Sequence, residues 1–286
     1  MFAQVRGTTL YFDVDGTGLV PDGPAMRERP AALVVHGGPG GDHTGFKPAM
    51  DPLTDTMQLV YFDHRGQGRS ARGDPALYTL DENVADMEAL RGHLGLGPVV
   101  SIGTSYGGMV AMAHAARHPG AVSKLILIVT AAHNGFMSQA EAFIRNHGTP
   151  EQQRVCQRLW SGTFETPGQM AEFYAVMGPL YSRRYDPAAA AAVRGRATYA
   201  PEPLNRAFGP GGTLRSFDLR AEVAGIQVPT LILAGRHDWI CPPAFSEELH
   251  GLIPGSQLQV FEGSSHTIRA DEPEALNDAI RAFVQA

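Results

Sequence analysis

Short apolar runs alternate with helical patterns along the first half of this chain. The strand-like runs cover Ala31 to His36, Leu59 to Asp63, Val99 to Gly103 and Leu125 to Thr130. Between the last three runs, residues 81–94 and 106–118 carry apolar side chains at helical spacing. Strands that alternate with helices pair in parallel, because each helix returns the chain to the same end of the sheet. The pattern predicts an α/β fold with a mostly parallel central sheet and flanking helices, and Thr8 to Asp15 is expected to be an edge hairpin strand.

The pattern changes from about residue 132 to residue 215. No strand-like run occurs there, and Ala, Gln, Glu, Met and aromatic residues dominate between Pro and Gly breaks. Strand-like runs resume at Thr230 to Ala234 and Leu258 to Phe261, before a closing helix over residues 273–284. We therefore expect one core, made of residues 1–131 and 216–286. A helical lid over residues 132–215 is predicted to be inserted after the sixth strand.

Composition excludes several classes of function. The formal net charge of −6 argues against a nucleic-acid partner, which favours clustered Lys and Arg. The N-terminus lacks the pattern of a signal peptide, and no run of about 18 apolar residues suggests a membrane span. The sequence therefore predicts a cytoplasmic protein with no membrane partner, and it does not indicate an oligomeric state.

The two cysteines, Cys156 and Cys241, lie far apart and have no metal-ligand spacing around them. Two reduced thiols are expected, although the sequence leaves a single pairing between them open. The eleven histidines form neither an HExxH motif nor another tight ligand pattern. Neither a metal ion nor an organic cofactor is predicted.

The segment Gly103-Thr104-Ser105-Tyr106-Gly107 lies between a strand-like run and a helical pattern. A serine on a sharp turn of this kind is exposed at the carboxyl edge of the sheet, and small flanking residues let the strand and helix approach each other. Ser105 is therefore the candidate nucleophile. The alternative is a plain tight turn, since the chain has 33 glycines.

A serine hydroxyl needs a general base and an acid that orients this base. Asp238 follows the strand-like run 230–234, and His266 follows the run 258–261, so the chain order is Ser, acid, His. Asp238 is the predicted acid and His266 the predicted base. Taken singly, Asp238 is equally consistent with a turn or cap residue, and His266 with a surface loop.

The glycine-rich segment His36-Gly37-Gly38-Pro39-Gly40-Gly41 follows an earlier strand-like run. A tetrahedral intermediate requires two backbone N–H donors, one from such a loop and one from the residue after the nucleophile. Gly38 and Tyr106 are the candidate donors of this oxyanion hole. His36 is interpreted as a support for the loop. A phosphate-binding loop is disfavoured because the GxxxxGK[ST] and GxGxxG spacings are missing.

With these motifs the chain resembles the α/β-hydrolase superfamily, and within it the proline iminopeptidase-like group of serine peptidases, amidases and esterases. Three blocks carry the resemblance, together with the segments around Asp238 and His266: His36 to Gly40, Asp63 to Ser70 and Gly103 to Gly108. The resemblance covers residues 8–131 and 216–284. It implies an α/β-hydrolase fold and acyl transfer through a serine without a cofactor.

In proline iminopeptidases the resemblance implies lid carboxylates that hold the free amino terminus of the substrate. Residues 159–165 match the family's Trp–Glu lid pattern in part, so Trp160, Phe164 and Glu165 are predicted substrate contacts, and the lid aromatic Tyr181 is the fourth. Further candidate amine anchors are Glu141, Glu172 and Glu202. Alternatively, these glutamates are solvated helix charges and the lid aromatics line an apolar acyl pocket.

The first hypothesis is a serine hydrolase that cleaves a small ester or amide, including an N-terminal amino acid or amino-acid amide, through an acyl-serine intermediate. Its partner is a small molecule or short peptide. A lactonase or thioesterase with the same triad is the alternative within this chemistry. A non-catalytic ligand-binding receptor on the same fold is the alternative from another class.

Overall fold

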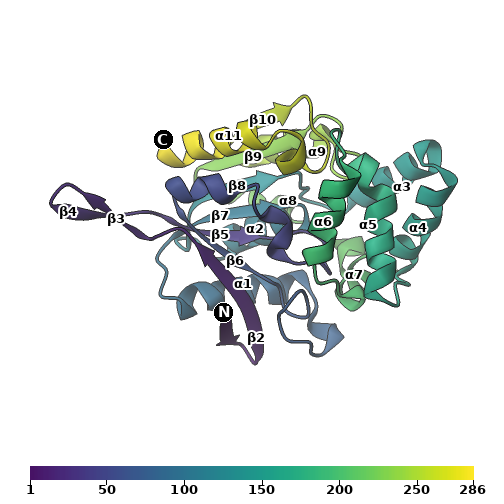
Figure 1. Ribbon diagram of the computed structural model, residues 1–286, viewed down its shortest axis with the longest axis horizontal. Coiled ribbons are helices and arrows are strands. Elements are labelled where there is room, and N and C mark those ends of the chain that lie inside the picture. The colour runs from purple at the N-terminus through teal and green to yellow at the C-terminus, as the bar shows by residue number, and fades with distance from the viewer.

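The computed structural model describes residues 1–286 and is built around an eight-stranded sheet (Figure 1). Its strands are β1 (Phe2–Val5), β2 (Thr8–Asp15), β5 (Ala31–Val35), β6 (Gln58–Phe62), β7 (Val99–Thr104), β8 (Val122–Ile128), β9 (Thr230–Gly235) and β10 (Gln257–Phe261). They lie in the order β1-β2-β6-β5-β7-β8-β9-β10. The six strands from β6 to β10 are parallel, whereas β1 and β2 are antiparallel to their neighbours. The predicted, mostly parallel sheet is confirmed.

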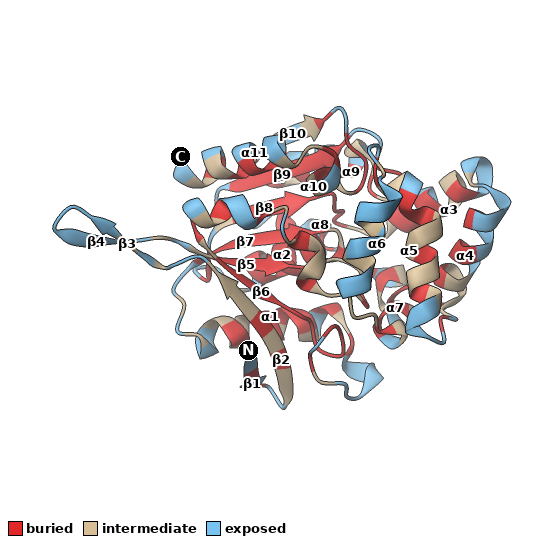
Figure 2. Ribbon diagram, viewed as in Figure 1, coloured by how far each residue is buried: buried red, intermediate tan, exposed pale blue.

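The N-terminal strands differ from the prediction in two respects. β2 pairs with β6 on one side and β1 on the other, so the sheet edge is the short strand β1 and not β2. A separate hairpin of β3 (Leu19–Asp22) and β4 (Ala25–Glu28) projects from the body of the protein and is almost fully exposed (Figure 2). This hairpin leaves no signal in the sequence, because its strands are exposed and show no apolar alternation.

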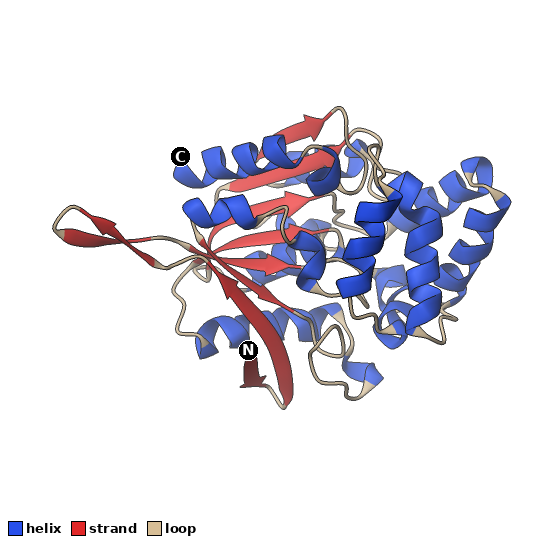
Figure 3. Ribbon diagram, in the orientation of Figure 1, coloured by secondary structure: helices blue, strands red, loops and turns tan.

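Helices cover both faces of the sheet (Figure 3). One face packs against α1 (Leu80–His93), α2 (Tyr106–Arg117), α8 (Arg220–Val223) and α9 (Pro243–Leu252). The other packs against η1 (His43–Phe46), η2 (Asp51–Asp55), α10 (Ile268–Asp271) and α11 (Pro273–Gln285). Because side chains alternate along a strand, Leu33 and Val35 join the first core and Ala32 and Val34 the second. The central strands therefore bury both faces and read as continuous apolar runs.

The segment between β8 and β9 is helical. It contains α3 (Gly135–His147), α4 (Pro150–Ser161), α5 (Pro167–Tyr181), α6 (Pro187–Arg196), α7 (Pro201–Phe208) and η4 (Thr213–Ser216). β8 is the sixth strand of the main sheet in chain order, and the helices gather beyond the carboxyl ends of the parallel strands (Figure 1). No helix of the protein combines the length and apolar character needed to cross a bilayer. The remaining short element is the 3-10 helix η3 (Pro75–Leu77). Loops between the elements carry the candidate site.

Candidate active site

Ser105 lies on a sharp turn between β7 and α2. Its backbone angles are φ 55° and ψ −122°, which are strained for a residue with a side chain. The turn is fixed from two sides: the Ser105 N–H donates to the Ile128 carbonyl (2.9 Å), and the Thr130 hydroxyl donates to the Ser105 carbonyl (2.8 Å). A Cβ atom on Gly108 would lie 2.7 Å from the Thr130 Cβ, so only glycine fits there. Strand, turn and helix together hold the Ser105 side chain at the carboxyl edge of the sheet.

The loops after β9 and β10 bring Asp238 and His266 together. The Nδ1 of His266 lies 2.7 Å from the Asp238 Oδ2. The other carboxylate oxygen accepts the N–H groups of Ile240 (2.8 Å) and Cys241 (3.0 Å), so the buried carboxylate is oriented by three partners. Because the carboxylate accepts the Nδ1 proton, the Nε2 of His266 is left as the proton acceptor.

The two loops approach each other very closely. A Cβ atom on Gly235 would lie 2.1 Å from the Ser265 carbonyl oxygen, so the contact requires a glycine at the end of β9. The His237 N–H donates to the Ser264 carbonyl (2.9 Å), and the Ser265 N–H donates to the buried Asp271 carboxylate (2.9 Å). These contacts fix the His266 backbone, so the Asp238–His266 distance is set by the fold.

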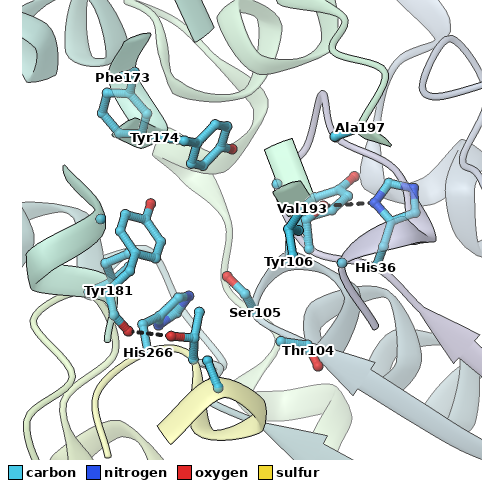
Figure 4. A pocket seen from close by; sticks show the side chains of 18 of the residues that line it. His36, Thr104, Ser105, Tyr106, Phe173, Tyr174, Tyr181, Val193, Ala197 and His266 are labelled. Carbon is cyan, nitrogen blue, oxygen red and sulfur yellow. Dashed lines mark hydrogen bonds between the residues drawn. The ribbon is translucent and has the colours of Figure 1, made fainter. Parts of the chain in front are cut away.

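Ser105 and His266 line one cavity of about 460 Å³ between the sheet and the helices of the insertion. In Figure 4, Ser105 lies in the centre of the cavity wall, with His266 and Tyr181 to its left and Tyr106 to its right. The Tyr181 ring meets the His266 ring edge to face, with centroids 5.6 Å apart. Burial raises the pKa of Tyr181, so its hydroxyl remains protonated.

The predicted oxyanion-hole residues line the same cavity. Tyr106 is the first residue of α2, so its N–H has no acceptor within the helix. The Gly38 N–H makes no backbone hydrogen bond. His36 supports this loop, since its Nδ1 lies 2.8 Å from the Gly37 carbonyl and its Nε2 accepts the His64 N–H (3.1 Å). Two unpaired N–H donors are therefore available near Ser105.

Two of the four predicted substrate contacts line the cavity and two do not. Trp160 and Tyr181 are in the lining. Phe164 is buried against Phe173 instead, with ring centroids 5.7 Å apart, because its segment is tied to α7 through its backbone. Glu165 is exposed at the turn before α5. The prediction for Phe164 and Glu165 is therefore corrected.

None of the candidate amine anchors reaches the cavity. Glu141 pairs with Arg215 (3.1 Å), and Glu172 pairs with Arg158 (2.7 Å), while Glu202 lies on α7 outside the lining. Asp42 is the only acidic residue that lines the cavity. Its carboxylate already accepts the N–H groups of Thr44 (3.0 Å) and Thr198 (2.8 Å).

Most of the cavity wall is apolar, and the lid aromatics in it, such as Phe173 and Tyr174, belong to the alternative in which these residues line an apolar acyl pocket. Residues from the core and from the helices after β8 contribute to it: Met109, Phe136, Leu159, Phe173, Tyr174, Tyr199, Leu204, Phe208, Leu214 and Trp239. For Trp239, the sequence gives one indication of its position, because it directly follows Asp238. The place of the aliphatic residues and Met109 depends on how the helices pack, and no pattern in the sequence marks them.

The residues described here indicate no metal or disulfide chemistry. No group of three or more His, Cys, Asp or Glu side chains is arranged to hold a metal ion. Cys156 and Cys241 are both free and buried. Burial raises the pKa of Cys241, so this thiol, which lies beside the acid loop, stays protonated and unreactive at neutral pH.

Comparisons with known proteins identify the family of this chain. The alpha/beta hydrolase fold family matches residues 30–273. The chain is 27% identical to the proline iminopeptidase PfmaB of Pestalotiopsis fici over 99% of both chains, and 29% identical to a proline iminopeptidase of Levilactobacillus brevis over 89% of this chain and 88% of the relative. A thermophilic esterase from Thermogutta terrifontis is 28% identical, with a TM-score of 0.76 over 100% of this chain and 98% of the esterase. The chain therefore belongs to the α/β-hydrolase fold family and is a hydrolase, and it is similar to proline iminopeptidases and esterases of that fold.

Proposed function

We propose that this protein is a cofactor-free serine acyl hydrolase in which Ser105 is the nucleophile, His266 the general base and Asp238 the orienting acid. The observation that carries the proposal is the joint geometry of three segments. Ser105 sits on a strained turn between strand and helix, His266 lines the same cavity, and Asp238 lies behind His266 at 2.7 Å from its Nδ1. Serine acyl transfer requires a nucleophile, a base and an orienting acid, and the placement of these three residues supports the proposal.

The reaction has two halves. His266 Nε2 takes the Ser105 proton while Oγ attacks the substrate carbonyl, and the N–H groups of Gly38 and Tyr106 stabilise the oxyanion. His266 then gives its proton to the leaving group, and the acyl group remains on Ser105. Water, deprotonated by His266, attacks the acyl carbon, and the released proton returns to Ser105. Throughout, the ionised Asp238 stabilises the imidazolium.

We further propose that the acyl group is apolar and carries no free amino group. The cavity wall is mainly apolar, and its one acid, Asp42, already accepts the N–H groups of Thr44 and Thr198 and pairs with Arg69 (3.5 Å). A free ammonium would be moved from water to a place without a carboxylate partner, which is unfavourable. Esters, lactones or acylated amides with an apolar acyl part suit this cavity better than N-terminal amino acids, the substrates that the names of the two relatives imply.

A substrate panel tests both statements. p-Nitrophenyl esters of increasing acyl length and p-nitroanilides with free or acylated amino termini are compared for the native protein and Ser105→Ala. We expect Ser105-dependent turnover of the esters and little or none of the free-amino anilides. Dominant cleavage of proline or other free-amino anilides would contradict the assignment of the acyl group. Turnover that is unchanged in Ser105→Ala, or no turnover of any substrate, would contradict the serine mechanism.

A further inference from the structure

All Lys and Arg residues of the cavity lining come from η1 and the following residues, from α6 and from α10. These segments contribute Lys47, Arg194 and Arg269, beside apolar residues such as Phe46 and Val193, and we call this part of the cavity its cationic end. The apolar end, in contrast, carries no Lys or Arg side chain. Such a division separates an apolar site for one part of a substrate from a charged site for another part.

Arg269 has no acidic partner. Its Nε donates to the Gly45 carbonyl (2.7 Å), and its guanidinium lies over the Phe46 ring, 5.5 Å from the centroid. No carboxylate lies within ion-pair distance, and the terminal nitrogens donate to no protein atom. Burial lowers the pKa of Arg269 to about 10, so the side chain still carries its charge at neutral pH. A partly buried charge without a counterion is a strong attractor for an anion.

The other charges around this end do not neutralise Arg269. Lys47 is already paired with Asp13 (2.6 Å) and Asp15 (2.8 Å). Asp42 accepts its protein N–H groups, as described above. Arg194 lines the cavity from α6 and makes no ion pair. The cationic end therefore presents two guanidinium groups that lack a counterion, in a protein whose net charge is −6.

The position of Arg269 indicates which part of the substrate it faces. Arg269 lies on α10, three residues after His266, and Thr267 and Ala270 of the same segment also line the cavity. His266 must approach the leaving-group atom within hydrogen-bond distance to protonate it. The leaving group therefore occupies the side of Ser105 that α10 covers, and the acyl group occupies the apolar side.

We infer that Arg269, together with Arg194, binds a carboxylate on the leaving group of the substrate. The preferred substrates are then esters of an apolar acyl group with a small hydroxy acid or hydroxyaryl acid. Arginine suits this task because its planar guanidinium binds a carboxylate through two parallel N–H bonds. This inference rests on the proposed serine hydrolase function and specifies its substrate class.

A matched pair of esters tests the inference in the native protein. The butanoyl ester of 4-hydroxybenzoate is compared with the butanoyl ester of 4-hydroxybenzamide, a neutral compound of nearly the same shape. Each kcat/KM is divided by the rate of hydroxide-catalysed hydrolysis of the same ester, which removes the difference in leaving-group reactivity. A hydrogen-bonded charge pair contributes about tenfold or more, so we expect the anionic ester to be preferred by roughly tenfold, and less at high salt.

A third ester distinguishes the two ends of the cavity. The monophenyl ester of succinate places its carboxylate on the acyl side, and the phenyl ester of butanoate is its neutral control. We expect no preference for the succinate ester, because its carboxylate would enter the apolar end. A preference for the succinate ester alone would overturn the assignment of Arg269 to the leaving group.

Three variants identify the residues responsible. Arg269→Gln is expected to reduce the preference for the anionic benzoate ester on the order of tenfold, and Arg269→Lys to retain part of it. Arg194→Gln, a change on α6 and not on the segment that follows His266, is expected to reduce the preference by less. Arg206→Gln is the matched control, since Arg206 is exposed on α7, has no ion pair and does not line the cavity. Circular dichroism and thermal melting verify that each variant is folded.

The possible outcomes separate this inference from the proposed function. Absence of Ser105-dependent turnover of either benzoate-type ester would contradict the proposed function itself. Equal turnover of the anionic and neutral esters by the native protein would overturn only the carboxylate subsite. A preference that persists in both Arg269→Gln and Arg194→Gln, or that falls equally in Arg206→Gln, would also overturn it.

Discussion

Asp238→Asn tests how His266 is held as a base. In the native protein the Asp238 Oδ2 lies 2.7 Å from the His266 Nδ1, and its Oδ1 accepts the N–H groups of Ile240 and Cys241. An asparagine has the same shape and retains the acceptor for the two backbone groups. However, its NH₂ would face Nδ1 and favour the tautomer that carries the proton on Nε2. His266 would then be unable to accept the Ser105 proton.

The expected loss follows from the lost charge and the wrong tautomer. Two unit charges about 4 Å apart attract by about 4 kcal/mol at an effective dielectric constant of about 20. Loss of this stabilisation of the imidazolium corresponds to a factor of about 10³ in rate. The comparable replacement in a serine-protease triad lowers kcat by about 10⁴. We therefore expect Asp238→Asn to lower kcat for a p-nitrophenyl ester by about 10³ to 10⁴.

The assay requires a folded variant and a matched control. Because Asn keeps the backbone hydrogen bonds of Asp238, the melting temperature is expected to fall by only a few degrees. Asp278→Asn, an exposed change on α11 outside the cavity, controls for the loss of one negative charge. If a folded Asp238→Asn protein retained more than a tenth of the native kcat, Asp238 would not be the orienting acid.

Three further properties are predicted. Gly108→Ala would place a Cβ 2.7 Å from the Thr130 Cβ, so we expect the free energy of unfolding, measured by urea denaturation, to fall by about 1–3 kcal/mol or more. An unchanged midpoint of the urea transition would contradict the tight contact. The Arg91 guanidinium lowers the pKa of Glu88 to about 2, so the ionised carboxylate stabilises the fold above its ordinary pKa, and this stabilisation is lost as the pH falls towards 2. Between pH 6 and pH 3 the melting temperature of Glu88→Gln should therefore fall less than that of the native protein. Equal decreases in the two proteins would refute the effect. The two buried cysteines should resist an aromatic disulfide reagent at pH 8 and both react after denaturation, whereas rapid labelling of the native protein would contradict their burial.

Much of the core was predictable from sequence because its strands are buried on both faces. The predicted runs 31–36, 99–103 and 230–234 match β5, β7 and β9 to within a residue or two at each end. Such strands appear as continuous apolar segments bounded by turns, which is a strong local signal. β1 and the hairpin β3–β4 gave no such signal, since β1 is four residues long and the hairpin lies in solvent.

The candidate triad was predictable for a different reason. Each of its members occupies a loop that directly follows a strand, so local sequence context indicates where each side chain lies. The cavity wall has no such marker. Trp160 and Phe164 are only four residues apart, but one faces the cavity and the other packs against Phe173, which depends on how α4 packs against α5 and α7. The unpaired charge of Arg269 likewise emerges only when the carboxylates around it are located in space.

Labelling of Ser105 tests the central claim most directly. The native protein, Ser105→Ala and His266→Ala are treated with a fluorophosphonate probe, and the modified residue is identified by peptide mass spectrometry. We predict rapid modification of the native protein at Ser105 alone, no modification of Ser105→Ala, and modification slowed by several orders of magnitude in His266→Ala. An unmodified native protein, or modification at another residue that persists in Ser105→Ala, would contradict the proposal that Ser105 is an activated nucleophile.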